Sequence, residues 1–366
     1  MFADRVKRID ASGIRKVFDL AATMEDPINL SIGQPDYDVP GAIKEAGIQA
    51  IRAGFNRYTV TQGIPELHER IRQMLSKTRG FEPEALLITS GTSGGLLLAL
   101  LATVNPGDEV IFPDPYFVMY KHLVNLCDGT PVFLDTYPDF RLHREALEAT
   151  ITPRTKMIIV NSPCNPNGVV YTPDELRMVH EVVGDRDIIV LSDEIYESLC
   201  YADTFTSMAS VHPSTLLLGG FSKAYAMTGW RLGYAAGSQA IISQMTKLQQ
   251  YTFVCAPAFA QKAGLVALDH DVSGHTADYR RKRDLIYRGL VDAGYDVVKP
   301  AGAFYIFPRV PWGNDMEFVE EAIRNNLLII PGSVFSEANT HFRIAYTAPD
   351  ATIERGLDVL SRIARK

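Results

Sequence analysis

The sequence is organised around Thr215–Arg231, which reads TLLLGGFSKAYAMTGWR. A short apolar run, Leu216 to Leu218, ends at two glycines, and Lys223 follows in a turn. A second apolar run, Leu232 to Ala236, begins directly after Arg231. Short apolar runs bounded by glycine are typical of buried strands, and polar residues beyond strand ends line the binding crevice of open α/β sheets. Lys223 is therefore a candidate nucleophile, although a lysine in such a turn is by itself usually a surface residue.

The composition is that of a soluble globular protein with room for two domains. The chain has 366 residues, 46% of them hydrophobic and 22% charged. The net charge of −7 argues against nucleic-acid binding, because phosphates need a basic surface. The cysteines are widely spaced and the histidines never fall at metal-ligand spacing, so we expect no disulfide framework, no metal and a reducing, cytoplasmic compartment. No signal peptide or membrane-spanning run is visible, and we expect no membrane partner.

From residue 86 onward, short apolar runs alternate with helical patterns, which predicts an α/β fold with a mostly parallel sheet. The expected strands are Leu86–Thr89, Val110–Phe112, Val132–Leu134, Met157–Val160, Ile188–Leu191, Leu216–Leu218 and Leu232–Ala236. Helices are expected between them at Ser93–Val104, Phe117–Asn125, His143–Thr150 and Pro173–Val183. Upstream we expect a helix containing Ile14, Val17, Phe18 and Ala21, a short strand at Leu30–Ile32, and helices at Pro40–Ala53 and Glu66–Lys77.

The C-terminal part predicts a smaller α+β unit. A helical segment from Gly237 to about His270, broken near Ala256–Pro257, leads to a helix at Tyr279–Ala293. Strand-like stretches follow at Tyr295–Lys299, Ala303–Pro308, Leu327–Ile330 and Phe342–Ala345, with an intervening helix and a final helix from about Ile353. We place the domain boundary inside the long helical segment. The large domain then spans residues 40–260, and the small domain combines residues 1–39 with 261–366.

Three other predicted strands also end in residues suited to one ligand. Leu86–Thr89 leads into Ser90-Gly91-Thr92-Ser93-Gly94-Gly95 and then a helix, where free N–H groups and the helix dipole favour an anion. Met157–Val160 ends in Asn161-Ser162-Pro163-Cys164-Asn165-Pro166-Asn167-Gly168, and Ile188–Leu191 ends in Ser192-Asp193-Glu194-Ile195-Tyr196. Each end has a structural interpretation of its own, as a turn or a helix cap. Their combination is what indicates a site.

A phosphate-binding turn, a buried acid, a lysine and an arginine together describe a pyridoxal phosphate site. Lysine forms a Schiff base with the cofactor, and an acid partners the pyridinium nitrogen. That acid keeps the ring protonated, so the ring can accept the electrons left when a bond to an amino acid's α-carbon breaks. A free lysine, with a pKa of about 10.4, is rarely neutral at pH 7. An internal aldimine lets substrate enter by imine exchange instead, and the released Lys223 can then carry a proton.

The stretch Ser222-Lys223-Ala224-Tyr225-Ala226-Met227-Thr228-Gly229-Trp230-Arg231 resembles the lysine signature of class I/II aminotransferases, pyridoxal-phosphate enzymes of fold type I similar to aspartate aminotransferase. The resemblance runs from Ser12-Gly13-Ile14-Arg15 to Phe342-Arg343-Ile344-Ala345-Tyr346. It implies a large domain with a mostly parallel seven-stranded sheet between helices, and a smaller α+β domain. Two alternatives stay open at this point: another reaction on the same scaffold, such as β-elimination or racemisation, and a non-catalytic relative that binds the cofactor.

The resemblance implies roles for the residues that match the family's motifs. Lys223 is expected to be the Schiff-base lysine, Asp193 the pyridinium partner, and Tyr196 and Asn165 the partners of the cofactor's phenolic oxygen. The remaining cofactor contacts are expected from Phe117 on the ring face, from Gly91, Thr92, Ser93 and Arg231 at the phosphate, and from Ser222. Arg343 is expected to grip the substrate α-carboxylate as a bidentate pair, with Gly33 and Asn165 beside it. Tyr58 resembles the tyrosine that reaches the neighbouring subunit's cofactor, which implies a homodimer.

Two positions depart from the commoner family pattern. Gly220 stands three residues before Lys223, where many relatives have a serine or threonine that bonds the phosphate. We expect that contact to be absent or replaced. Asn167 takes the place of the usual threonine of N-P-T-G, a turn position that we expect to tolerate it.

The sequence thus predicts amino-group transfer from an L-amino acid, aspartate-like or aromatic, to a 2-oxo acid such as 2-oxoglutarate, by a ping-pong mechanism. A dicarboxylic substrate needs a second cation, for which Arg15, Arg52 and Arg57 are candidates.

Overall fold

A seven-stranded sheet forms the centre of the computed structural model, which describes the whole chain except residues 1, 11–12, 14–21, 23, 203 and 366. The strand order is β2-β8-β7-β6-β5-β3-β4. The strands are β2 (Ala85–Ser90), β3 (Glu109–Asp114), β4 (Thr130–Asp135), β5 (Thr155–Asn161), β6 (Ile189–Asp193), β7 (Leu216–Gly220) and β8 (Leu232–Gly237). Each coincides with a strand expected from the sequence. β8 runs antiparallel to β2 and β7, and the other neighbours pair in parallel, so the sheet is mostly parallel as predicted.

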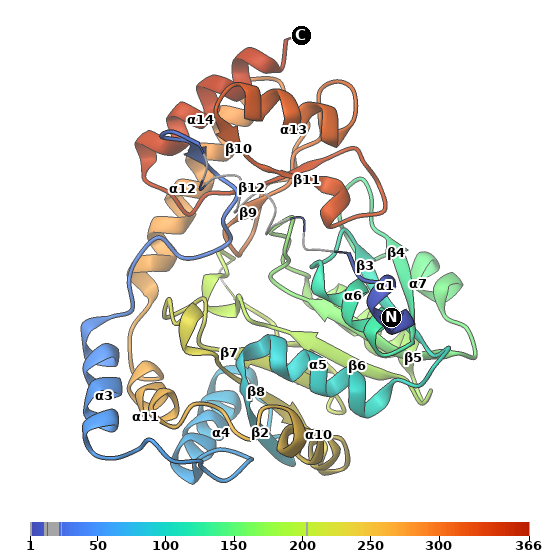
Figure 1. The fold of residues 1–366 in the computed structure, drawn as a ribbon. Helices are drawn as coiled ribbons and strands as arrows, with labels where there is room; N and C mark the ends of the chain where they lie inside the picture. Colours follow the sequence, from blue (N-terminus) through green and yellow to red (C-terminus); the bar gives the residue numbers. More distant parts are fainter. Residues whose placement is uncertain (1, 11–12, 14–21, 23, 203, 366) are drawn as a thin grey trace.

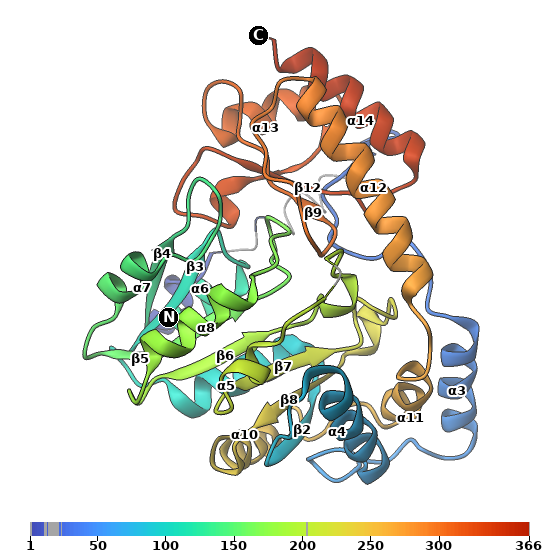
Figure 2. The ribbon, with the colours of Figure 1, turned by 180° about the vertical axis from the view of Figure 1, so that it is seen from behind.

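Helices pack on both faces of this sheet (Figures 1 and 2). One face carries α5 (Gly91–Thr103), α6 (Met119–Leu126) and α10 (Gln239–Thr252). The other carries α4 (Pro65–Arg79), α7 (Arg144–Thr150), α8 (Pro173–Val183), α9 (Met208–Val211) and α11 (Ala258–Ala267), with α3 (Gly41–Arg52) against α11. Both faces of the sheet are apolar, as strand β5 illustrates: Ile159 packs against the helices of the first face and Ile158 against those of the second. Strands buried on both faces read as continuous apolar runs.

Local signals explain where several helices begin. α8 starts at the predicted residue because Pro173 occupies its first turn, while Thr172 and Glu175 form a capping box. The long helical segment divides into α10 and α11, as expected, and Val254 between them has a φ of 64°.

A smaller unit lies above one edge of the large sheet (Figures 1 and 2). It contains an antiparallel sheet of β11 (Ile330–Pro331), β12 (Phe342–Ala345) and β9 (Tyr305–Ile306). β1 (Ile28–Asn29) pairs in parallel with β10 (Leu327–Leu328), so the N-terminal strand lies with C-terminal elements. The helices of this unit are α12 (Ser273–Asp292), α13 (Asp315–Arg324) and α14 (Asp350–Ile363). Short helices occur at α1 (Asp4–Lys7), η1 (Glu197–Leu199), η2 (Thr228–Trp230) and η3 (Gly332–Val334). The domain boundary near residue 260 stays a prediction.

Two strand predictions need correction. Residues 295–299 form no strand: Val297 and Val298 pack against apolar clusters, but the backbone forms no ladder, and the carbonyl of Asp296 accepts a hydrogen bond from the N–H of Arg309. The strand expected at Leu30–Ile32 lies earlier, at β1, although the N–H of Leu30 still donates to Leu328. The helix expected around Ile14, Val17, Phe18 and Ala21 falls outside the described residues. Across the described part of the chain, no helix is long and apolar enough to cross a membrane.

Candidate active site

A cavity of about 210 Å³ opens at the edge of the large sheet where the parallel strands end, and Tyr305 and Arg343 of the smaller unit also line it. The carboxyl ends of β5, β6 and β7 reach this edge because these strands are parallel. β8 runs the other way, so it brings its first residues, next to Arg231, to the same edge. The predicted site residues that line the cavity are Gly33, Thr92, Ser93, Phe117, Asn165, Asp193, Tyr196, Ser222, Lys223, Arg231 and Arg343. Gly91 and Tyr58 are the predicted residues that do not line it.

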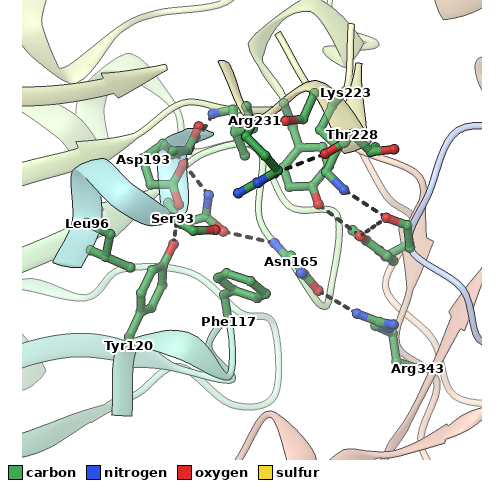
Figure 3. A pocket seen from close by; sticks show the side chains of 17 residues that line it. Ser93, Leu96, Phe117, Tyr120, Asn165, Asp193, Lys223, Thr228, Arg231 and Arg343 are labelled. Atoms are coloured by element: carbon green, nitrogen blue, oxygen red, sulfur yellow. Dashed lines mark hydrogen bonds between the residues drawn. The ribbon is translucent and has the colours of Figure 1, made fainter. Parts of the chain in front are cut away.

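Lys223 projects into the cavity from the turn after β7 (Figure 3). Its Nζ donates to the carbonyl of Gly33 at 2.8 Å. Burial lowers the pKa of Lys223 to about 8, with Arg343 and Arg231 adding to the effect and Asp193 opposing it. A lysine with this pKa is neutral for an appreciable fraction of the time near neutral pH, which is the state that a nucleophile or base requires.

Asp193 ends β6 and is 4% exposed. Its Oδ2 accepts a hydrogen bond from the Tyr120 hydroxyl at 2.8 Å, and its Oδ1 accepts one from the N–H of Ile195 at 3.3 Å. Both partners are neutral. Burial raises the pKa of Asp193 to about 6, although these hydrogen bonds and Lys223 act in the opposite direction. A buried carboxyl held by neutral donors favours a cation placed beside it.

Arg343 lies in β12, on the side of the cavity opposite Asp193 (Figure 3), and is 1% exposed. Its guanidinium donates to Asn165 Oδ1 at 3.1 Å and to the carbonyl of Ser31 at 2.9 Å. The rings of Phe335 and Tyr305 lie 4.4 and 4.5 Å from the guanidinium carbon. Its Nε has no hydrogen-bond partner among the described residues. Burial lowers the pKa of Arg343, so this charge lies in a site where a carboxylate would relieve its desolvation.

Polar side chains fill the space between these charges. The Tyr196 and Tyr305 hydroxyls are 2.8 Å apart. Asn161 Nδ2 donates to the carbonyl of Asp193 at 2.9 Å, and Asn161 Oδ1 accepts from the N–H of Asn165 at 3.0 Å. Because Asn165 Oδ1 already accepts from Arg343, the Asn165 amide nitrogen is the atom left to donate toward a ligand.

The N-terminus of α5 and Arg231 form one corner of the cavity. No side chain in the described part of the chain caps α5, so its first N–H groups keep their hydrogen-bonding capacity for a ligand. Gly91 has a φ of +68°, and a Cβ there would stand 2.6 Å from Arg231 Nη2. Gly91 therefore contributes by letting the arginine approach rather than by lining the cavity.

Both departures from the family pattern have structural explanations. A Cβ at position 220 would stand 2.7 Å from Thr92 Oγ1, so Gly220 makes room for the Thr92 side chain that lines the cavity. Asn167 is 2% exposed, and its Oδ1 accepts a hydrogen bond from the N–H of Val169 at 3.0 Å. Asparagine is well suited to such a turn, as the sequence predicted.

Comparison with known proteins gives the family. Residues 25–360 match the model described as "Aminotransferase class I and II". The whole chain is 40% identical to a putative aminotransferase of Bacillus subtilis and 37% identical to an aspartate aminotransferase of Pyrococcus abyssi, and it covers 98% of each. An aspartate aminotransferase from Thermus thermophilus, solved with maleate, is 32% identical and superposes over 99% of both chains with a TM-score of 0.96. An aromatic aminotransferase from Pyrococcus horikoshii is 35% identical, with a TM-score of 0.90 over 96% of this chain and 98% of the other.

The chain belongs to the class I and II aminotransferases. It is a transferase of fold type I, as predicted, and the family implies pyridoxal phosphate as its cofactor. The cavity of this aminotransferase fits that cofactor in three respects. The uncapped α5 N-terminus with Arg231 suits a phosphate, Asp193 with its neutral partners suits a protonated ring nitrogen, and the recessed amine of Lys223 suits an aldehyde.

Other predicted residues lie elsewhere. Tyr58 is 83% exposed in the loop after α3. Arg52 and Arg57 are exposed and do not line the cavity, and Arg15 lies outside the described residues.

Sequence reasoning missed several cavity residues: Leu96, Tyr120, Asn161, Ile195, Thr228 and Tyr305. Of these, Asn161 and Ile195 stand in the polar segments at or just after the ends of β5 and β6, so their position is a usable signal. Tyr120 on α6 and Tyr305 on β9 carry no local sequence signal, because only the tertiary fold brings them to the cavity.

Proposed function

We propose that this aminotransferase moves the amino group of an L-amino acid, either aspartate-like or aromatic, to a 2-oxo acid such as 2-oxoglutarate. The observation that carries the proposal is the pairing of two recessed cations in one cavity. Arg343 is buried, and its acceptors among the residues that the structure describes are neutral. Lys223 faces the same space with a lowered pKa. An α-amino acid carries the carboxylate that the first would bind and the α-proton that the second would move.

Lys223 is the residue that we propose binds the cofactor covalently and then transfers the proton at the substrate α-carbon. Asp193 is proposed to hold the ring nitrogen protonated, and Tyr196 and Asn165 to donate to the phenolic oxygen. When bound, pyridoxal phosphate supplies the ring that accepts the electron pair released at that carbon. The lowered pKa of Lys223 supports this role, because the amine must be neutral to accept the proton.

The remaining cofactor contacts are proposed from the corner around α5. Gly91, Thr92, Ser93, Ser222 and Arg231 would hold the phosphate through backbone N–H groups, hydroxyls and one charge. Phe117 would lie on the ring face, since it lines the cavity between the α5 corner and Arg343 (Figure 3). Gly33 would border the substrate carboxylate beside Arg343.

We also propose a homodimer in which Tyr58 reaches the phosphate in the partner subunit. Tyr58 is exposed, and so are the neighbouring apolar side chains Phe55 and Val60, together with Tyr251 at the end of α10. Gln249 of α10 and Gln261 of α11 donate to Thr61 and Thr59, which links this loop to the two helices. Large exposed aromatic side chains on a fixed loop are suited to an interface.

The choice between the two kinds of donor depends on what contacts the substrate side chain. Among the described residues, the arginines and lysines that line the cavity are Lys223, Arg231 and Arg343, all of which already have proposed roles. A distal carboxylate would therefore need a cation from Arg15 or from the partner subunit. Relatives named for aspartate and for aromatic amino acids both match this chain. We further propose a cytoplasmic location, which the four free cysteines favour.

A donor screen with 2-oxoglutarate tests the function. Glutamate should form with aspartate or an aromatic amino acid, and Lys223→Ala should abolish both turnover and the borohydride-reducible visible chromophore. Release of ammonia with pyruvate, without glutamate, would identify the β-elimination alternative instead. Relatives named as aminotransferases favour transfer over that alternative. An active and coloured Lys223→Ala protein would refute the assignment.

A further inference from the structure

The segment from Gly33 to Tyr37 forms hydrogen bonds with both the side-chain amine and the backbone carbonyl of Lys223. At one end, the carbonyl of Gly33 accepts a hydrogen bond from Lys223 Nζ at 2.8 Å. At the other, the Tyr37 hydroxyl lies 3.1 Å from the carbonyl of Lys223 and 2.9 Å from that of Ala224, and donates to this pair. Burial, with Asp36 contributing, raises the pKa of Tyr37 well above its usual range, so the phenol stays a neutral donor.

Helix α12 of the smaller unit fixes this segment in place. Tyr279 donates its hydroxyl to Asp36 Oδ1 at 2.8 Å, and Lys282 Nζ contacts Asp36 Oδ2 at 2.5 Å. Lys282 is 8% exposed and Asp36 21% exposed at their side chains, so solvent only partly screens the ion pair. His275, also on α12, stacks on the Tyr37 ring with centroids 3.6 Å apart and planes within 4°.

The turn that carries Lys223 needs such support. Ala226, three residues after Lys223, has a φ of +54°, a conformation that non-glycine residues adopt at a cost. Without an external donor, the carbonyls of Lys223 and Ala224 would lose a hydrogen bond within a partly buried turn. The Tyr37 hydroxyl is the side-chain donor that reaches both of these carbonyls.

We propose that Tyr37 is a positioning residue for Lys223, and that Asp36, Tyr279 and Lys282 fix Tyr37 to α12. The proposal rests on the cofactor-binding role of Lys223. Tyr37 would hold the turn so that the Lys223 amine stays in the desolvated position between Gly33 and the cavity charges. The charged groups that face this amine are Asp193, Arg231 and Arg343, and the rings of Tyr196 and Phe304 lie within 6 Å of it.

The test uses Tyr37→Phe, which keeps the ring and its stacking but removes the donor. Cofactor-free protein is mixed with pyridoxal phosphate, samples are reduced with borohydride at intervals, and labelled Lys223 is counted by peptide mass spectrometry at a series of pH values. We expect capture to be about fivefold slower in the variant, the factor that corresponds to loss of one neutral hydrogen bond. The midpoint of its pH profile should also rise, because a less restrained amine is better solvated.

Two further variants make the result specific. Tyr295→Phe is the matched control, because Tyr295 is also a buried tyrosine that donates to a backbone carbonyl, that of Leu360 at 3.0 Å, and does not line the cavity. It should lower the Tm without moving the pH midpoint. Tyr279→Phe should shift the midpoint in the same direction as Tyr37→Phe, and it replaces that variant if Tyr37→Phe fails to fold.

The outcomes separate the two proposals. If the Lys223→Ala protein still acquires the label on another residue of the cavity, the proposal that Lys223 binds the cofactor is wrong. If Lys223→Ala is not labelled but Tyr37→Phe and Tyr279→Phe match Tyr295→Phe in rate and midpoint, only the positioning role of Tyr37 is overturned.

Discussion

Replacing Arg343 by methionine should nearly abolish catalysis while leaving the protein almost as stable as before. Arg343 and Arg79 are both buried, but their surroundings are opposite. Among the described residues, the hydrogen-bond acceptors of Arg343 are all neutral. Arg79 instead forms a salt bridge with Glu194 at 2.7 Å, with both side chains at most 2% exposed. Arg79→Met is therefore a matched control that removes the same group from an equally buried place.

The stability changes follow from what each substitution leaves behind. Arg79→Met leaves the Glu194 carboxylate buried without its cation, which should lower the free energy of unfolding by about 3–5 kcal/mol. Arg343→Met leaves two neutral acceptors, Asn165 Oδ1 and the Ser31 carbonyl, each worth about 1–3 kcal/mol if unsatisfied. It also removes a buried charge without a counter-ion, which is itself unfavourable. We expect these effects to offset, so the net change should be about 1 kcal/mol or less.

The catalytic change should run in the opposite order. A bidentate carboxylate contact comprises two charge-assisted hydrogen bonds at about 1.5–3 kcal/mol each, so Arg343→Met should lower kcat/KM by about two to four orders of magnitude. Arg343→Lys should fall between this variant and the wild type, because a point charge keeps the attraction but not the fork. Arg79→Met should retain most of its kcat/KM under conditions where it is folded.

Urea unfolding of the cofactor-free proteins and steady-state kinetics with the best donor from the screen measure both quantities. Absorbance of bound pyridoxal phosphate confirms that each variant still binds the cofactor. The reasoning fails if Arg343→Met is destabilised as much as Arg79→Met, because its charge would then be neutralised within the protein. It fails equally if kcat/KM of Arg343→Met falls less than about tenfold, because a loss of that size corresponds to at most one neutral hydrogen bond.

Three further predictions concern the cofactor. In cofactor-free protein, Asp193→Asn should raise the Tm at about pH 8 but hardly at about pH 4. The pKa of Asp193 in the folded protein, about 6, exceeds its ordinary value, so the wild type loses stability as the pH rises from that ordinary value through 6. Equal Tm shifts at both pH values in thermal melts would contradict this. Gly220→Ser puts a Cβ 2.7 Å from Thr92 Oγ1, so cofactor affinity in equilibrium dialysis should fall about tenfold. On a Thr92→Ala background, which also lacks the proposed hydroxyl contact to the phosphate, the same substitution should cost almost nothing; unchanged affinity of the single variant would rule out the clash. Mixing Lys223→Ala with Tyr58→Ala subunits should give hybrid dimers with one complete site and wild-type cofactor affinity, and no recovery of activity on mixing would mean that Tyr58 does not act across subunits.

The large sheet could be predicted because its strands are buried on both faces. Leu216–Leu218 and Met157–Val160 are continuous apolar runs, and each is flanked by turn residues, so their limits are visible in the sequence. The same turn residues mark the site. The stretch at residues 295–299 misled the prediction because its apolar residues pack against the core without pairing to a strand, and side-chain patterns do not report backbone pairing.

Partners supplied by distant elements could not be predicted. Tyr120 bonds to Asp193 because β6, β5 and β3 are neighbours in the sheet and α6 follows β3, which the local pattern of α6 does not contain. The carbonyl of Ser31 reaches Arg343 for a similar reason, since the chain after β1 lies next to β12: the Ala345 N–H donates to the Leu30 carbonyl. Such contacts depend on strand order.

The partners of the buried charges separate structural groups from functional ones. Arg79 with Glu194, and Lys282 with Asp36, have counter-ions within the chain, so their desolvation is offset before any ligand arrives. Asp193 and Arg343 have neutral hydrogen-bond partners, so each lacks a counter-ion within the described part of the chain. A ring nitrogen would supply the cation for the first, and a substrate carboxylate the anion for the second. Because each ligand relieves a cost already present in the empty protein, cofactor binding should stabilise the fold by more than its contact area suggests, and substrate should add to that stabilisation.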